Sequence, residues 1–219
     1  MKNNSCDLAG VDANPLPRMP LTRLTWVRDG QRFDIVAPDH ALVVLHADAL
    51  LAWYNAPDNA SMMEGSGAMT RDDVIEFWTT LQDGGGYGFL AFVDGRLVGD
   101  ADVRGIEGSV GEFAIMIGDS RDKGRGIGKT IARMVHVFAY REIGLERLYV
   151  PPRRDNAPVH ALNAFLGYER DDSPAARAFA DSPHCDTYSM GAETFRRLHA
   201  DAWAEVRPTS GADLDEGAP

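Results

Sequence analysis

Cysteine and long apolar runs are scarce in this sequence, and each shortage excludes a class of protein. The 219 residues include two cysteines, Cys6 and Cys185. Because Cys6 lies in a terminal stretch for which we expect no fixed structure, we predict no structural disulfide and a reducing, cytoplasmic setting. No apolar run approaches the roughly 20 residues that span a bilayer, and the N-terminal segment lacks the apolar stretch of a signal peptide. We therefore expect no membrane partner.

Positive charge is also in deficit. Lysine and arginine number 22 against 33 aspartates and glutamates, which gives a formal net charge of −11. This balance disfavours nucleic acid as a partner and favours a cationic or amine ligand over a polyanion. The two cysteines do not form a C-x-x-C pair, and His40, His46 and His184 show no ligand-like spacing, so we predict no metal site.

What the sequence does contain is the composition of a folded globular domain. Hydrophobic residues make up 44% of the chain and charged residues 25%, and the length suits one domain with extensions at its ends. Residues 1–20 carry three prolines and are predicted to form an irregular arm. Residues 21–206 are predicted to form a single domain, and residues 207–219 a disordered acidic tail.

Periodicity and turn residues predict an α+β order of elements within that domain. Asp29-Gly30 and Asp94-Gly95 are typical of tight hairpins. Helices are expected over 48–54, 70–82, 127–142, 158–165 and 193–206. Strands are expected over 24–27, 33–36, 88–93, 96–103, 110–117, 147–150 and 186–190. Together they predict a mixed, mostly antiparallel sheet flanked by helices.

The most informative stretch runs from Gly111 to Gly128 and reads GEFAIMIGDSRDKGRGIG. It passes from an apolar strand into a segment of glycines and cations, which leads into an amphipathic helix. Glycines let backbone N–H groups approach phosphate oxygens closely, and the N–H groups of a first helical turn point at an anion. The stretch therefore predicts an anion-binding site.

This stretch and the one that follows it resemble the GNAT superfamily, the N-acetyltransferases that use acetyl-CoA. The pyrophosphate loop of that family reads Q/R-x-x-G-x-G/A, and residues 123–128 match it with lysine in the first place, although a second register over 121–126 also fits. A second family signature is matched from Asn156 to Gly167-Tyr168. The resemblance covers roughly residues 24–192 and implies an acyl-CoA N-acyltransferase fold with a splayed strand pair. In style it is nearest to the ribosomal-protein N-terminal, polyamine and antibiotic acetyltransferases.

The resemblance implies roles for individual residues. The loop would hold the coenzyme pyrophosphate through main-chain N–H groups, the end of the preceding strand would pair with the pantetheine arm, and Asn156 would hydrogen-bond that arm. The predicted coenzyme-binding residues are Met116, Ile117, Gly118, Lys123, Gly124, Arg125, Gly126, Ile127, Gly128, Lys129, Asn156 and Asn163. Glu112 would act as the catalytic base; the alternative is that it faces solvent or pairs with an arginine such as Arg104.

One position departs from the family pattern. Asn163 stands where many members carry a tyrosine that returns a proton to the thiolate, and a neutral amide cannot supply a proton. Tyr168, Tyr188 or a water could take that part, or the thiolate could leave without a dedicated acid.

The implied function is direct transfer of an acetyl group from acetyl-CoA to a primary amine within a ternary complex. The amine would belong to a small molecule, such as an aminoglycoside or a polyamine, or to a peptide N-terminus, and a homodimer is compatible with the family. We expect the first two helices, the Met-containing loop over 59–69 and the connection over 171–184 to contact the acceptor. The alternatives are a non-catalytic acyl-CoA-binding module and a P-loop; the first glycine of a P-loop would fall at Lys123, one residue before Gly124.

Overall fold

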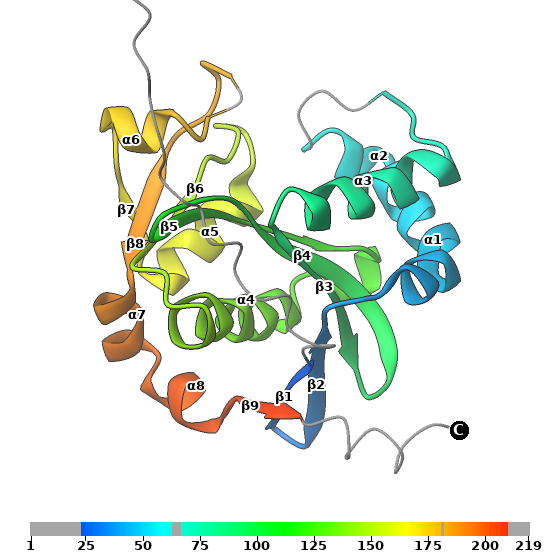
Figure 1. Ribbon diagram of the computed structural model, residues 1–219, viewed down its shortest axis with the longest axis horizontal. Helices are drawn as coiled ribbons and strands as arrows, with labels where there is room; N and C mark the ends of the chain where they lie inside the picture. Colours follow the sequence, from blue (N-terminus) through cyan, green and yellow to red (C-terminus); the bar gives the residue numbers. More distant parts are fainter. Residues whose placement is uncertain (1–22, 63–66, 181, 210–219) are drawn as a thin grey trace, which may run out of the picture.

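The computed structural model describes residues 23–62, 67–180 and 182–209. Within them, one mixed sheet of nine strands runs in the order β7-β8-β6-β5-β4-β3-β2-β1-β9 (Figure 1). The strands are β1 (Arg23–Arg28), β2 (Gln31–Val36), β3 (Tyr87–Val93), β4 (Arg96–Glu107), β5 (Val110–Ile117), β6 (Arg147–Val150), β7 (Glu169–Arg170), β8 (Tyr188–Gly191) and β9 (Arg207–Thr209). Among the strands described, β5 and β6 alone pair in parallel. The predicted α+β class with a mostly antiparallel sheet is confirmed.

Helices lie on both faces of this sheet (Figure 1). They are α1 (His40–Tyr54), α2 (Pro57–Ala60), α3 (Arg71–Asp83), α4 (Ile127–Val137), α5 (Ala157–Leu166), α6 (Pro174–Arg177), α7 (Ala192–Leu198) and α8 (Ala200–Glu205), with a 3-10 turn η1 (Ser120–Asp122) and a π turn η2 (Phe138–Glu142). None of the helices described is long and apolar enough to cross a bilayer.

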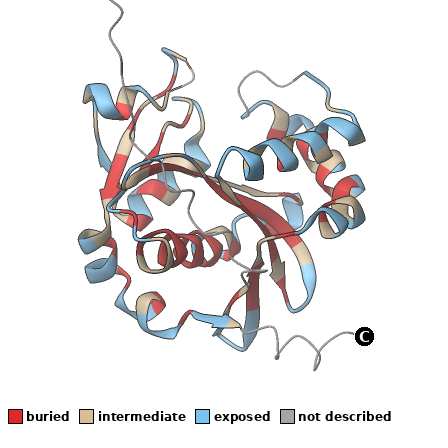
Figure 2. Cartoon of the chain, in the orientation of Figure 1, coloured by how far each residue is buried: buried red, intermediate tan, exposed pale blue. Residues whose placement is uncertain are grey.

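Strand alternation divides the core into two clusters. Successive side chains of a strand point to opposite faces, so Phe89 and Ala91 of β3 join the cluster around α4, while Leu90 between them joins the cluster around α1 and α3. Every residue of α4 from Thr130 to Val137 is buried, as Figure 2 shows for the helix beneath the sheet. The other face of the sheet is covered by α1 and α3, and it is this face that carries the site.

The two predicted Asp-Gly hairpins are confirmed. Asp29 and Gly30 have φ of 51° and 77°, and Asp94 and Gly95 have φ of 50° and 77°. Positive φ at both central residues is the geometry of a type I′ turn, whose twist matches that of the flanking strands.

Three predicted boundaries were wrong. Helix α1 begins at His40 rather than residue 48, because Asp39 accepts a hydrogen bond from the Leu42 N–H at 2.8 Å and caps it. The closing helix is broken at His199 into α7 and α8. Residues 207–209 form β9 against β1, so the chain is ordered for three residues of the predicted tail; the remainder of that tail and the predicted N-terminal arm lie outside the described residues.

Candidate active site

Two neighbouring strands, β5 and β6, separate part-way along their length. They pair at three positions, the last of which joins Glu112 to Tyr149. Beyond it β5 stays paired with β4 as far as Ile117, whereas β6 gives way to Pro151 and Pro152. Proline has no N–H to offer a strand ladder, so the pair cannot continue. The predicted splay is present, and Glu112 lies where it opens.

A cavity of about 730 Å³ lies over this divergence, within the range of small-molecule sites. Its floor comes from β4 and β5, one wall from α1 and α3, and the other from the β6–α5 junction. The lining includes Tyr54, Met62, Met69, Asp73, Phe77, Trp78, Asp100, Asp102, Arg104, Glu112, Met116, Arg153, Asn156, Val159 and Asn163. The first two predicted helices and the Met-containing loop therefore contribute lining residues, whereas no described residue of the 171–184 connection does.

The glycine loop that follows β5 has the geometry of an anion site. Gly124 and Gly126 have φ of 74° and 84°, which favours glycine because a Cβ is strained there. Gly126 caps α4 without a side-chain hydrogen bond, so no side chain caps the N–H groups of the first helical turn. Residues 123–126 are exposed, and the loop lies outside the cavity walls. Lys129 extends over the ring of Phe165 on α5, with Nζ 4.5 Å from its centroid.

Two contacts that the sequence analysis missed fix this loop. Arg96, at the start of β4, donates two hydrogen bonds of 2.8 Å to the buried carboxylate of Asp122, and these hydrogen bonds lower the pKa of Asp122. Lys123 donates its ammonium to Asn59 Oδ1. Asn59 in turn donates to the Gly118 carbonyl at 3.1 Å. The loop is thus tied both to the sheet and to α2.

Gly118 supports this arrangement through its small size. A Cβ there would lie 1.9 Å from Trp53, so the indole of α1 packs directly on the backbone. The Gly118 N–H donates to the Val98 carbonyl at 3.0 Å, and its carbonyl accepts from Asn59. Both of its main-chain groups therefore have partners within the protein. Its neighbour Ile117 packs against the α4 cluster, and of the three predicted strand-end residues only Met116 lines the cavity.

Glu112 pairs with Arg104, which was the alternative considered for it, and it also lies at the cavity. It lines the cavity, and its Oε1 accepts hydrogen bonds from Arg104 Nη2 at 2.7 Å and Nε at 3.2 Å. The two residues are cross-strand partners on β5 and β4. The carboxylate is therefore oriented by the arginine while it faces the cavity.

Asn156 and Asn163 lie two turns apart along α5 and both line the cavity. Asn156 caps the helix, with Oδ1 accepting from the Val159 N–H at 3.2 Å. Asn163 is 2% exposed, yet within residues 23–62, 67–180 and 182–209 neither its Oδ1 nor its Nδ2 has a hydrogen-bond partner. A buried unpaired amide costs about 1–3 kcal/mol, so this side chain fits a polar ligand that would occupy the cavity.

The tyrosines considered as proton donors lie elsewhere. Tyr168 is buried on the α4 side, where its hydroxyl is 2.8 Å from His136 Nε2. The Tyr188 hydroxyl is 3.1 Å from His160 Nδ1. Neither tyrosine lines the cavity, so the structure assigns neither to the reacting atoms.

An acidic pair on the cavity floor was not predicted. Asp100 and Asp102 of β4 are buried, and Asp100 accepts a hydrogen bond of 2.6 Å from the Tyr54 hydroxyl. Burial raises the pKa of Asp100 to about 7 despite that hydrogen bond, and the nearby charge of Asp102 adds to the rise. Burial also raises the pKa of Asp102, against the opposing charge of Arg104. The sequence does indicate this pair, because the two acidic residues occupy alternate positions of a strand whose other face is apolar.

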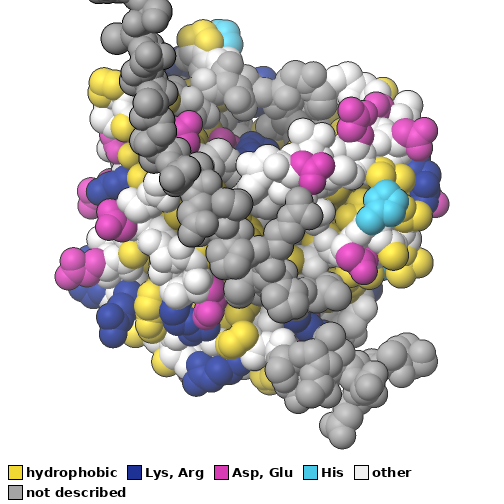
Figure 3. Space-filling model, viewed as in Figure 1, with side chains coloured by type: hydrophobic (Ala, Val, Ile, Leu, Met, Phe, Trp, Pro, Cys, Tyr) yellow, Lys and Arg dark blue, Asp and Glu magenta, His cyan; other side chains and the backbone are white. Residues whose placement is uncertain are grey.

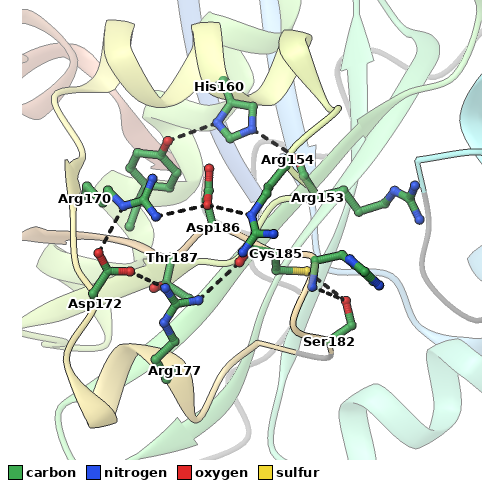
Figure 4. A network of polar contacts seen from close by, with 12 residues as sticks. Arg153, Arg154, His160, Arg170, Asp172, Arg177, Ser182, Cys185, Asp186 and Thr187 are labelled. Carbon is green, nitrogen blue, oxygen red and sulfur yellow. Dashed lines mark hydrogen bonds and ion pairs between the residues drawn. The ribbon is translucent and has the colours of Figure 1, made fainter.

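A network of ion pairs holds the wall formed by the β6–α5 junction (Figure 4). Asp186 lies 3.2 Å from both Arg154 and Arg170. Arg170 also pairs with Asp172 at 3.0 Å, and Arg177 contacts the same carboxylate. His160 bridges the Tyr188 hydroxyl and the carbonyl of Arg153. The 171–187 segment therefore braces the loop that carries Arg153 and Asn156 rather than lining the cavity itself.

Comparisons with known proteins agree with this geometry. Residues 40–169 match the family model described as Acetyltransferase (GNAT) domain. No curated protein matches the sequence.

Solved structures share the fold at low sequence identity. Aminoglycoside acetyltransferase AAC(6')-Ib in complex with coenzyme A is 15% identical, with a TM-score of 0.60 over 70% of this chain and 94% of that one. Mycobacterium smegmatis RimJ in complex with CoA-disulfide is 17% identical, with a TM-score of 0.61 over 84% and 95%. A chimera of spermidine N-acetyltransferase SpeG from Vibrio cholerae and hSSAT is 14% identical, with a TM-score of 0.60 over 74% and 97%. These neighbours give a mixed open sheet of the same kind, which does not fit the P-loop alternative.

The family match spans more than half of the chain, and it falls on the sheet, loop and helices that build the cavity. The chain therefore belongs to the GNAT acetyltransferase family.

Proposed function

We propose that the protein transfers an acetyl group from acetyl-CoA directly to a primary amine, with both substrates bound at once in the cavity. The observation that carries this proposal is the buried, unpaired amide of Asn163 in a cavity that opens where β5 and β6 part. The uncapped N-terminus of α4 fits a diphosphate, and the amide fits the polar pantetheine arm. Both features suit acetyl-CoA as the donor.

On the donor side, the residues of this chain bind and orient. Main-chain N–H groups of residues 123–129 would hold the diphosphate, and Arg96 and Asn59 would keep the loop in place through their contacts with Asp122 and Lys123. Met116 and its neighbours on β5 would pair with the pantetheine arm as an added strand pairs with a sheet edge. Asn163 would reach the thioester end of the arm.

On the acceptor side, Glu112 would take a proton from the incoming ammonium. The freed nitrogen then attacks the thioester carbonyl carbon, the C–N bond forms, and the C–S bond breaks with its electron pair going to sulfur. The second proton that the nitrogen loses as it becomes an amide passes to the thiolate or to solvent. Asn163 Nδ2 can hydrogen-bond the departing thiolate, which needs no dedicated acid because a thiol has a reference pKa of about 8.5. Arg104 keeps the Glu112 carboxylate facing the cavity.

A small-molecule amine suits the cavity better than a peptide chain. The space is bounded on one side by α1 and α3 and on the other by the β6–α5 junction, and its floor is acidic. Two of the structural neighbours are described as an aminoglycoside acetyltransferase and a spermidine N-acetyltransferase, which supports an amine of this size as the acceptor.

The test is a thiol-release assay with acetyl-CoA and a panel of aminoglycosides, polyamines, amino acids and peptide N-termini. We expect at least one amine to release thiol above background. A protein that binds acetyl-CoA to saturation and releases none with any amine would instead be a non-catalytic module.

Glu112→Gln tests the base. We expect turnover to fall about 100-fold or more, most strongly at low pH where the amine is protonated, while acetyl-CoA affinity stays unchanged. Glu107→Gln, an exposed change of the same kind at the end of β4, is the matched control. Arg104→Gln tests whether the ion pair itself is what matters. If this variant loses as much turnover as Glu112→Gln, the ion pair is required for activity and the loss in Glu112→Gln does not identify a base.

A further inference from the structure

Building on the proposed function, we propose that Asp100 and Asp102 form a subsite for a second ammonium group. The acceptor is then a diamine or polyamine: one nitrogen is acetylated near Glu112, and another is held on the β4 pair. The acidic pair thereby selects the acceptor class.

The register of the sheet places the pair along a line that leads away from Glu112. Arg104 of β4 is opposite Glu112 of β5, Asp102 is opposite Ala114, and Asp100 is opposite Met116. With a rise of about 3.4 Å per residue, two residues along β4 correspond to roughly 7 Å. Along the strand direction, Asp102 is therefore displaced from the position of Glu112 by roughly 7 Å, and Asp100 by about twice that distance. All three carboxylates line the same cavity.

The pair has little positive charge of its own. Among the described residues, Asp102 Oδ1 is buried without a hydrogen-bond partner, and its ion-pair partner, Arg104 Nε, lies 3.7 Å away. That guanidinium also donates twice to Glu112. Asp100 accepts a hydrogen bond from the Tyr54 hydroxyl, which carries no charge. An ammonium group brings three N–H donors and a positive charge, which is what two buried carboxylates in this position require.

A second observation, on the opposite wall, also points to a bound polar molecule. Asn163 lines the same cavity, is 2% exposed, and has neither amide atom paired within the part of the chain that the structure describes. The proposed function assigns this amide to the coenzyme arm, so the coenzyme and the acceptor together would satisfy the polar groups of the two walls.

The charge around the cavity favours a cation. Its lining carries four carboxylates, Asp73, Asp100, Asp102 and Glu112, and two arginines. Of these arginines, Arg104 contacts Glu112, and Arg153 forms a two-point pair with Asp155 at 3.0 and 2.9 Å. Figure 3 shows further carboxylates over α1 and α3 on the outside of the same lobe, where Asp48, Asp72 and Glu76 are exposed. A field of this sign raises the local concentration of a polycation.

The experiment compares linear diamines with monoamines of equal length, using acetyl-CoA and thiol release. For the wild-type protein we expect kcat/KM for a diaminoheptane to exceed that for heptylamine by about 10- to 100-fold, the range for a hydrogen bond to a charged group. Ethylenediamine has a shorter distance between its nitrogens, so its advantage over ethylamine should be smaller than that of the diaminoheptane over heptylamine. This length series needs no variant and stands even if a substitution prevents folding.

Asp102→Asn keeps the shape and removes the charge. We expect it to abolish most of the diamine preference, measured as the ratio of kcat/KM for the diaminoheptane to that for heptylamine, through a higher KM for the diamine. Asp72→Asn, on the exposed face of α3, removes the same charge and should leave the preference intact.

The outcomes separate the two proposals. Equal turnover of heptylamine and the diaminoheptane by the wild type, or a diamine preference retained in Asp102→Asn, would overturn the subsite while leaving acetyl transfer in place. Binding of acetyl-CoA with no thiol release from any amine would overturn acetyl transfer, and the subsite with it.

Discussion

Substituting Gly126 by aspartate should separate folding from coenzyme binding, because stability should hardly change while affinity for the coenzyme should fall sharply. Gly126 has φ 84° and ψ −7° and is the N-cap of α4. A Cβ built there meets no atom within 4 Å, so a side chain fits in the free protein. It would project at the helix N-terminus to which we assign the diphosphate.

The magnitudes favour a nearly unchanged fold. A left-handed backbone costs a non-glycine residue about 1–2 kcal/mol, and aspartate and asparagine tolerate it best. An aspartate at a helix N-terminus stabilises the fold by about 0.3–1 kcal/mol through the helix dipole, and aspartate is also favoured at the N-cap position. These effects roughly cancel, so the free energy of unfolding should change by less than about 1 kcal/mol.

Coenzyme binding should respond much more strongly. A carboxylate about 4 Å from one phosphate charge is repelled by about 1 kcal/mol in water and by about 4 kcal/mol at the effective dielectric constant of a protein surface. The dissociation constant for acetyl-CoA should therefore rise by about 5- to 1000-fold. Gly126→Asn is the matched control, since it has the same shape and the same tolerance for a left-handed backbone but no charge.

Isothermal titration calorimetry with coenzyme A and thermal unfolding of the free protein make the comparison. The difference between the aspartate and asparagine variants should also shrink as salt is added, because salt screens exposed charges. Equal affinity of the two variants for coenzyme A, at low and at high salt, would refute the assignment of the diphosphate to this helix N-terminus.

Three further changes test the core and the cavity. Gly118→Ala places a methyl group 1.9 Å from Trp53 and should cost about 1–3 kcal/mol; thermal unfolding should show partial rescue in the double variant with Trp53→Leu. Burial lowers the pKa of His136 to about 3, so the unfolded chain binds one more proton than the folded chain as the pH falls below about 6.5. The free energy of unfolding should therefore drop by up to about 1.4 kcal/mol per pH unit. In urea titrations at several pH values, the free energy of unfolding of His136→Gln should depend less steeply on pH than that of the wild type. Asn163→Leu removes an unpaired buried amide and should raise the stability of the free protein by about 1 kcal/mol or more while lowering acetyl-CoA affinity; reduced stability with unchanged affinity would argue against a ligand contact.

Local sequence was enough to predict those parts of the fold whose geometry depends on adjacent residues. The Asp-Gly hairpins, the glycines of positive φ and the helix that follows them all depend on backbone preferences within a few positions. The family resemblance predicted that two neighbouring strands separate, and the two prolines after β6 give the physical reason for the separation of β5 and β6. The same local reasoning missed the start of α1, because Asp39 caps a run of apolar residues that carries no strong helical periodicity of its own.

The parts that could not be predicted depend on contacts between distant segments. Tyr54 and Asp100 are separated by 46 residues and meet at 2.6 Å, and Lys123 reaches Asn59 across 64 residues. Alternation along β4 shows that Asp100 and Asp102 share a face, but it does not show whether that face meets solvent or a cavity. Only the packing of α1 and α3 over the sheet decides that the pair is buried.

The binding sites proposed for the two substrates differ in the same way, one depending on local and the other on distant contacts. The donor side is built from one continuous stretch, β5 with its loop and α4, so a motif can identify it. The acceptor side is assembled from α1, α3 and β4, whose residues become neighbours only in the fold, and no short pattern contains them. Members of a family built in this way can keep one coenzyme site while the opposite wall changes its charge and shape, because substitutions there do not disturb the loop. In this chain that wall carries two buried carboxylates, and the specificity of the protein should be decided by what neutralises them.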